Sequence, residues 1–240
     1  MRVAERQIEE QRTPLDGGFL DGIDTLIVIG FDSRPTDQQA SPGEIAAIRA
    51  FLAEPGHMLF VCPHHDIGNA DDLPEDQRQP RREAEFYHHG DPAIPAQQQF
   101  GGFGLSLLAG LGLPVRNRFG LRPAKAPDGS SAPLEIDAAA DRFGLLDGVA
   151  SFNLHPHLPH FELLGDSATR FDVLARQDVD LTAPPHPFVL AGGHRFNALL
   201  QTRPDVCAGS LLVCDTTLWS STAGGVESLQ RFWRNVVQRA

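Results

Sequence analysis

Two short apolar runs flank a well-marked helix within residues 24–62, and this succession constrains the fold more than any other feature of the sequence. The first run is Asp-Thr-Leu-Ile-Val-Ile-Gly at 24–30, and the second is Met-Leu-Phe-Val-Cys at 58–62. Continuous apolar runs of this length are typical of strands buried on both faces of a parallel sheet. Between them, Ser41 and Glu44 have the spacing of a helix capping box. The sequence therefore predicts a strand–helix–strand unit with parallel strands.

The remainder of the chain supplies further elements of the same kind. Residues 210–215 predict another buried strand, and an amphipathic helix follows from about residue 226. Residues 100–111 predict a helix whose glycines allow close packing on the sheet. Short strands are predicted at 171–175 and 187–191. We expect one domain over residues 1–240, an α/β fold of three layers with a mostly parallel sheet flanked by helices, preceded by an N-terminal arm at 1–22.

Residues 66–99 differ from the rest because they are polar and rich in proline, with few apolar side chains. Loops of this length are uncommon in compact domains, and those that occur usually cover a site or bind a partner. We therefore expect a long loop or lid over these residues.

Charge and cysteine content limit the classes of partner. The chain has 20 basic and 31 acidic residues, a formal net charge of -11. Because nucleic acids and anionic membranes attract basic surfaces, we expect neither as a partner. No apolar run reaches the length of about 18 residues that a membrane-spanning helix needs.

The 3 cysteines argue against a disulfide framework and for a reducing, cytoplasmic location.

The order of elements resembles the class I glutamine amidotransferase-like superfamily, in the broad sense that includes its ThuA-like branch. Residues 24–65 and 209–237 carry this resemblance, which implies a flavodoxin-like arrangement. Catalytic members place a cysteine in a Gly-x-Cys-x-Gly turn and pair it with a distant His-x-Glu. Cys62 is the candidate here, and it lacks both glycines, so we do not expect glutaminase activity. ThuA-like relatives have a histidine just after this strand, which His64 or His65 could match.

The predicted catalytic residues follow the second strand directly, at Cys62, His64, His65 and Asp66. Ligands of open α/β sheets bind at the carboxyl ends of the strands, so this cluster should face a crevice. Histidine acts there as base, acid or metal ligand near neutral pH. The alternative is that these histidines are solvated or bind only their own loop.

A second histidine cluster comprises His155, His157 and His160. Alternation along an extended segment places the first two on one side, close enough to share a cation. Together with His64 and Asp66 they form the predicted metal set, which suits zinc or iron. The alternative is a polar turn that binds nothing.

Two further pairs are candidates for substrate binding. His88 and His89 lie near the end of the long loop, and Asp215 and Thr216 follow the last strand. The next helix could hold an anion at its N-terminus. Alternatively, Ser221 or Thr222 only caps that helix.

These residues predict a hydrolase-type enzyme that acts on a small-molecule substrate with a histidine-rich, metal-assisted site. A metal-free variant uses Cys62 as the nucleophile. The alternative is a catalytically inactive binding or assembly module of the same fold. Such a module could form a homodimer through an exposed sheet edge or through the helix that contains Trp233.

Overall fold

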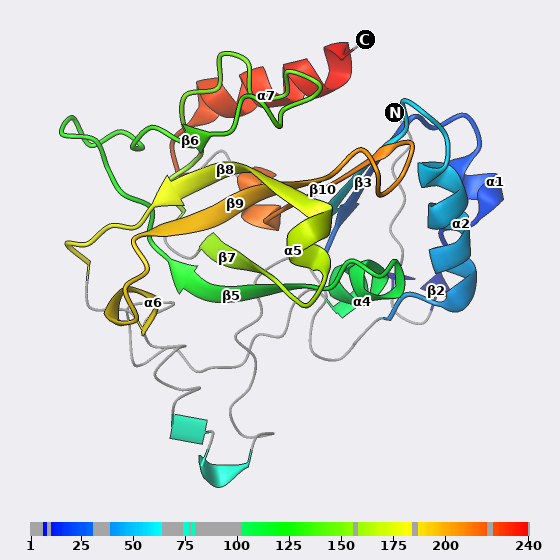
Figure 1. The fold of residues 1–240 in the computed structure, drawn as a ribbon, viewed down its shortest axis with the longest axis horizontal. Coiled ribbons are helices and arrows are strands. Elements are labelled where there is room, and N and C mark those ends of the chain that lie inside the picture. Colours follow the sequence, from blue (N-terminus) through cyan, green and yellow to red (C-terminus); the bar gives the residue numbers. More distant parts are fainter. Residues whose placement is uncertain are drawn as a thin grey trace.

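A six-stranded sheet in the order β3-β4-β10-β9-β8-β6 forms the centre of the protein (Figure 1). The computed structural model describes residues 7–8, 11–30, 39–63, 74–76, 78–79, 102–155, 158–183, 187–219 and 223–239. The strands of this sheet are β3 (Thr25–Ile29), β4 (Met58–Cys62), β10 (Ser210–Cys214), β9 (Arg195–Thr202), β8 (Phe171–Asp178) and β6 (Glu135–Ile136).

The sheet is mixed, so the expectation of a mostly parallel sheet is wrong. β3, β4 and β10 are parallel to one another, whereas β9, β8 and β6 each pair antiparallel with their neighbours. Only residues 203–209 connect β9 to β10. A parallel pair needs a crossover of about a dozen residues or more, so this connection permits only an antiparallel pair.

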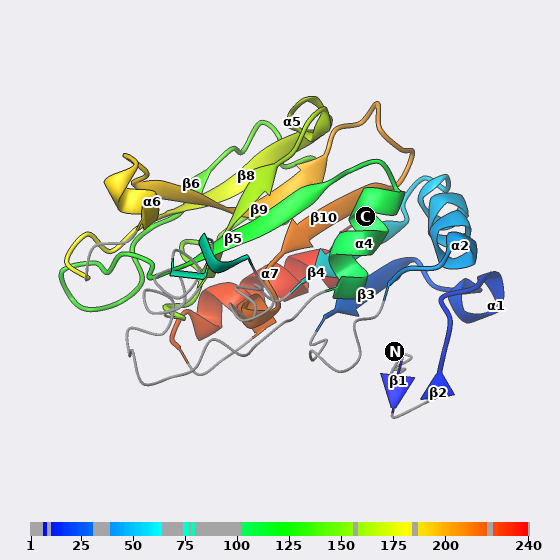
Figure 2. The same cartoon turned by 90° about the horizontal axis from the view of Figure 1, so that it is seen from below.

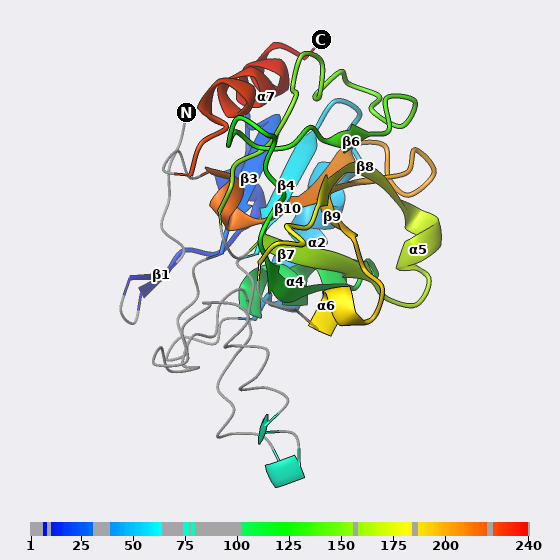
Figure 3. The same cartoon turned by 90° about the vertical axis from the view of Figure 1, so that its left-hand side faces the viewer.

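Helices and a two-stranded ribbon cover the two faces of the sheet. Helix α7 (Val226–Gln238) lies on one face, and α2 (Pro42–Leu52) and α4 (Gly102–Gly110) lie on the other (Figure 3). The ribbon pairs β5 (Val115–Leu121) with β7 (Leu158–Leu163) on the α4 side (Figure 2). The remaining elements are short: β1 (Gln7–Ile8), β2 (Gln11–Arg12), α1 (Gly17–Leu20), α5 (Ser167–Arg170), α6 (Pro187–Leu190) and the 3₁₀ helix η2 (Thr216–Trp219).

The strand–helix–strand unit forms as its sequence predicts. Every residue of β4 is buried, because alternate side chains enter the clusters on both faces of the sheet. Phe60 points toward α7 and meets the ring of Phe232 edge to face at 6.1 Å. Ser41 and Glu44 form the predicted capping box at the start of α2.

The glycines of α4 allow close packing, as the sequence predicts. A Cβ at Gly104 would lie 3.2 Å from the Val61 side chain on β4. A Cβ at Gly110 would lie 2.3 Å from Ile45 on α2. Larger residues at either position would push the helix away from its neighbours.

Two local predictions are wrong. Residues 187–191 do not form a strand, because Pro187–Leu190 is the short helix α6 and β9 begins only at Arg195.

The N-cap of α7 is Gly225 rather than Ser221 or Thr222, which lie outside the described residues. Gly225 has a φ of 67°, and a Cβ there would lie 2.7 Å from the carbonyl oxygen of Phe152. A left-handed residue without a side chain is therefore required at this helix start.

Among the described residues, no helix combines the length and the apolar character needed to cross a membrane.

Candidate functional site

Thr216 joins the carboxyl ends of three strands. Its backbone N–H donates to the carbonyl oxygen of Pro63 at 3.4 Å. Its hydroxyl lies within hydrogen-bond reach of the carbonyl oxygens of Cys62 and Gly30, the latter at 3.2 Å. A hydroxyl has one proton, so it donates to one of these carbonyls at a time. Thr216 therefore fastens the chain leaving β10 to the ends of β3 and β4.

Asp215, predicted to bind substrate, is buried beside Thr216 with only 4% of its surface exposed. Its Oδ1 accepts hydrogen bonds from the backbone N–H of Thr217, at 2.8 Å, and from the Thr217 hydroxyl. These bonds fix one carboxylate oxygen at the start of η2. Since buried carboxylates need such donors, they account for how Asp215 is tolerated here.

A distant segment, residues 152–155, packs against the same strand ends. The side-chain amide of Asn153, which is 1% exposed, donates from Nδ2 to the carbonyl oxygen of Thr217 at 2.7 Å. Its Oδ1 accepts from the backbone N–H of His155 at 3.2 Å. Leu154 N–H donates to the carbonyl oxygen of Ala223 at 2.7 Å. His155 and Asp215 are thus linked by a continuous series of hydrogen bonds through Asn153 and Thr217, which we call the carboxyl-edge chain.

Cys62 lies beneath this edge with its side chain in the core. It is 0% exposed, and its Sγ is 3.5 Å from the Sγ of Cys214 on the neighbouring strand. The hydrogen bond to Cys62, together with burial, raises the pKa of the Cys214 thiol well above 9.0. A thiol in such surroundings is a poor nucleophile, because the thiolate is the reactive form.

The ring nitrogens of His160 are not available to bind a metal. Its Nδ1 accepts a hydrogen bond from the backbone N–H of Asn197 at 3.2 Å, and its ring lies 5.2 Å from that of Phe188. A neutral imidazole that accepts at Nδ1 has its proton on Nε2, so neither nitrogen offers a lone pair to a metal.

The remaining predicted residues lie outside the described part of the chain: His64, His65, Asp66, His88, His89 and His157. Within the described residues, no three side chains of His, Cys, Asp or Glu come together as a metal-binding group.

Sequence reasoning missed two features of this region. One is Asn153, whose role depends on long-range hydrogen bonds that no local pattern indicates. The other is the triplet His160-Phe161-Glu162, a His-x-Glu of the kind that catalytic amidotransferases pair with their cysteine. Its local signal is the glutamate two positions after His160. It lies on β7, where Phe161 is buried in the core on the face opposite to Cys62.

A groove of about 530 Å³ lies at the other edge of the sheet, between α1 and α2. Its lining includes Asp21, Asp24, Phe51 and His57. The Nδ1 of His57 lies 2.9 Å from the carbonyl oxygen of Phe51, which fixes this ring against the end of α2. The groove is at the amino ends of the parallel strands, away from the carboxyl-edge chain.

No protein-family model matches the sequence, and comparisons with curated proteins and with solved structures also gave no match.

Proposed function

We propose that this protein is a hydrolase-type enzyme of glutamine amidotransferase-like, flavodoxin-like architecture, with its site at the carboxyl ends of β4 and β10. The observation that carries the proposal is the carboxyl-edge chain, which brings His155 to the edge where Asp215 lies. Open α/β sheets bind ligands at this edge.

The roles follow from the chemistry of the two residues. His155 is half-buried, and an imidazole in that position can take a proton from water near neutral pH. Asp215 places a buried carboxyl group at the same edge, which in its charged form would stabilise an imidazolium within its reach. In the metal-assisted form of the proposal, His155 would hold zinc or iron together with His64, Asp66 and His157, and the bound ion would supply a water of lowered pKa. The substrate is a small molecule with an acyl or similar electrophilic centre.

Hydrolysis of a panel of p-nitrophenyl esters and anilides tests the proposal. We expect His155→Ala to reduce kcat/KM by about 100-fold or more, the range of general acid–base catalysis. His194→Ala is the matched control, because His194 is an exposed histidine directly before β9, outside the carboxyl-edge chain. Equal activity in His155→Ala and wild type would refute a role for His155.

Elemental analysis of untagged protein separates the two forms of the enzyme. Zinc or iron near one equivalent in wild type, reduced in His155→Ala, supports the metal-assisted form. Activity without metal, unaffected by chelators, supports the metal-free form.

One observation favours the alternative, a catalytically inactive binding or assembly module. The hydroxyl of Thr216 and one oxygen of Asp215 both form hydrogen bonds within the chain, so they stabilise the fold at this edge. Under this alternative, hydrolysis stays at the buffer rate for all substrates, and light scattering detects a homodimer at micromolar concentration.

A further inference from the structure

Cys62 and Cys214 occupy neighbouring positions on parallel strands. The register pairs Val61 with Val213, so the two cysteines are the next residues along β4 and β10. Both side chains enter the cluster of buried residues beneath α7. They are therefore on the same face of the sheet, as a direct bond between them requires.

The two sulfur atoms are in hydrogen-bonding contact. Cys62 Sγ and Cys214 Sγ are 3.5 Å apart, and both residues are present as thiols. A disulfide has a sulfur–sulfur length of about 2 Å and joins Cα atoms about 4.4–6.8 Å apart. Neighbouring strands are spaced about 4.8 Å apart, which falls within that range. Rotation of the two side chains by a small amount is enough to bring the sulfurs together.

We propose that hydroperoxides convert Cys62 and Cys214 into a reversible disulfide that ties β4 to β10 directly beneath the carboxyl edge. This inference is independent of the proposed hydrolase activity. The metal-assisted form of the hydrolase uses neither Cys62 nor Cys214. The proposal therefore gives this pair a role of its own, as a site of oxidative modification.

The chemistry balances with one equivalent of hydrogen peroxide. The first sulfur loses its proton once local opening exposes it to water, and the thiolate then attacks a peroxide oxygen. The O–O bond breaks, and the departing oxygen takes up a proton to leave as water. The product is a sulfenic acid on that cysteine. The second sulfur then attacks it, the S–O bond breaks and a second water leaves. The two sulfurs lose two electrons in total, which the peroxide gains.

Access to the pair requires local opening of the fold. Both cysteines are 0% exposed, so the oxidant reaches them only when the residues packed around them move apart transiently. A peroxide is small enough to enter through such an opening, whereas a bulky disulfide such as oxidised glutathione is not. Once formed, the bond would hold together the two strand ends that Thr216 now joins by hydrogen bonds.

Cys207 provides an internal control. Its Sγ lies 3.4 Å from the carbonyl oxygen of Gly209 and 3.8 Å from the Thr202 hydroxyl, before the start of β10. It is at the opposite end of β10 from Cys214. It is also more exposed than the other two cysteines, so random oxidation would favour it.

The test is peptide mapping by mass spectrometry of the folded, full-length chain after treatment with hydrogen peroxide and alkylation of the remaining thiols under denaturing conditions. We expect a cross-linked pair of peptides containing Cys62 and Cys214, lighter than the two thiol peptides by two hydrogens. Dithiothreitol should restore both thiols. Cys207→Ala should give the same cross-link in a similar fraction of molecules.

Three results would overturn the proposal. One is a cross-link that involves Cys207, and another is sulfinic acid at Cys62 or Cys214 in place of a cross-link. The third is that both thiols stay reduced while Cys207 oxidises. Because the map is read on wild type and on Cys207→Ala, the outcome does not depend on variants of the buried pair folding. A rise in Tm on oxidation, reversed by dithiothreitol, would independently report the new tie between the strands.

Discussion

Asn153 donates a hydrogen bond from Nδ2 to the carbonyl oxygen of Thr217 across 2.7 Å, although the two residues are 64 positions apart in the sequence. Asn153 is also bound through its backbone, since its carbonyl oxygen lies 3.5 Å from Nε2 of the buried Gln177. The segment at 152–155 is therefore attached both to η2, which follows β10, and to β8. This attachment fixes where His155 enters the candidate site.

Replacing Asn153 with alanine should destabilise the fold. The change leaves the buried carbonyl of Thr217 without the amide that it binds now, and such a loss costs about 1–3 kcal/mol. Urea unfolding followed by circular dichroism measures the difference. Thr169→Ala is the control, because the Thr169 hydroxyl bonds to Asp166 at an exposed position and its loss should change stability much less. Equal effects of the two changes would contradict the role given to Asn153.

The parallel part of the sheet was predictable from the sequence, whereas of its antiparallel part only β8 was predicted, at 171–175. β4 is an uninterrupted apolar strand, Met58–Cys62, that is buried on both faces. β5, in the separate antiparallel ribbon with β7, alternates buried and exposed residues at its start and includes Arg116 and Asn117, so no apolar run marks it. Strands of this kind are defined by their partners across the sheet rather than by their own composition.

Gly209 should not tolerate a side chain. A Cβ there would lie 2.7 Å from the carbonyl oxygen of His57, and backbone atoms cannot move aside as a flexible side chain can. We expect Gly209→Ala to lower the free energy of unfolding by about 1–3 kcal/mol, the range found for overpacking.

Gly43→Ala is the matched control for this change and should have the opposite sign. Gly43 lies in the first turn of α2, where a Cβ would meet only Ser41 Oγ at 3.9 Å. Alanine favours the helix over glycine by up to about 1 kcal/mol. Urea midpoints of the two variants, compared with wild type, should move in opposite directions.

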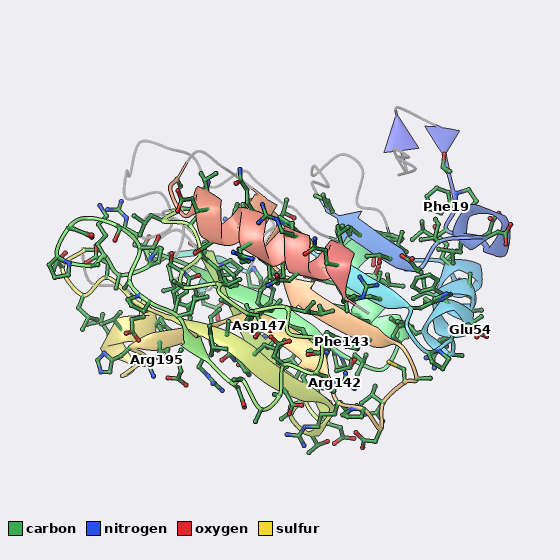
Figure 4. All side chains as sticks on the ribbon, turned by 90° about the horizontal axis from the view of Figure 1, so that it is seen from above. Phe19, Glu54, Arg142, Phe143, Asp147 and Arg195 are labelled. Atoms are coloured by element: carbon green, nitrogen blue, oxygen red, sulfur yellow. The ribbon has the colours of Figure 1, made fainter. Side chains whose placement is uncertain are left out.

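Two arginines should differ in their contributions to stability. Arg195 pairs with Asp178 at 2.6 Å and with Glu135, and all three side chains are over 40% exposed. Arg142 is an exposed residue, but its guanidinium lies over the ring of Phe143 (Figure 4) and donates to the carbonyl oxygen of Thr202 at 2.6 Å in a hydrogen bond that is partly buried. Arg195→Met should therefore change stability by less than about 1 kcal/mol, with a smaller effect in high salt.

Arg142→Met should have the larger effect. Charged hydrogen bonds that are partly buried contribute about 1.5–3 kcal/mol, so we expect a loss in that range with little dependence on salt. Thermal unfolding at low and high ionic strength distinguishes the two variants. A salt-sensitive loss at Arg142, or a large loss at Arg195, would contradict this assignment.

The candidate site was predicted in part. Cys62, Asp215 and Thr216 lie at or just after the ends of predicted strands. This position was enough to place them near the carboxyl edge of the sheet. It did not indicate that the thiol of Cys62 points into the core toward Cys214, because the side to which a strand residue points depends on register with its neighbours. The link from His155 to Asp215 is a property of tertiary structure and has no local signature.

The thiol of Cys214 should make the fold sensitive to alkaline pH. Its hydrogen bond with Cys62 and its burial raise its pKa well above 9.0, the ordinary value that it regains on unfolding. Between these two values the unfolded chain has lost the proton and the folded chain retains it. The contribution of this thiol to the free energy of unfolding should therefore be fully present below about pH 8 and fall as the pH rises through 9 and beyond.

Unfolding by urea from pH 7 to 10.5 under reducing conditions measures this decline. Cys214→Ala should flatten it, whereas Cys207→Ala should flatten it less, since Cys207 is only half-buried. A decline that is as steep in Cys214→Ala as in wild type would show that other groups cause it.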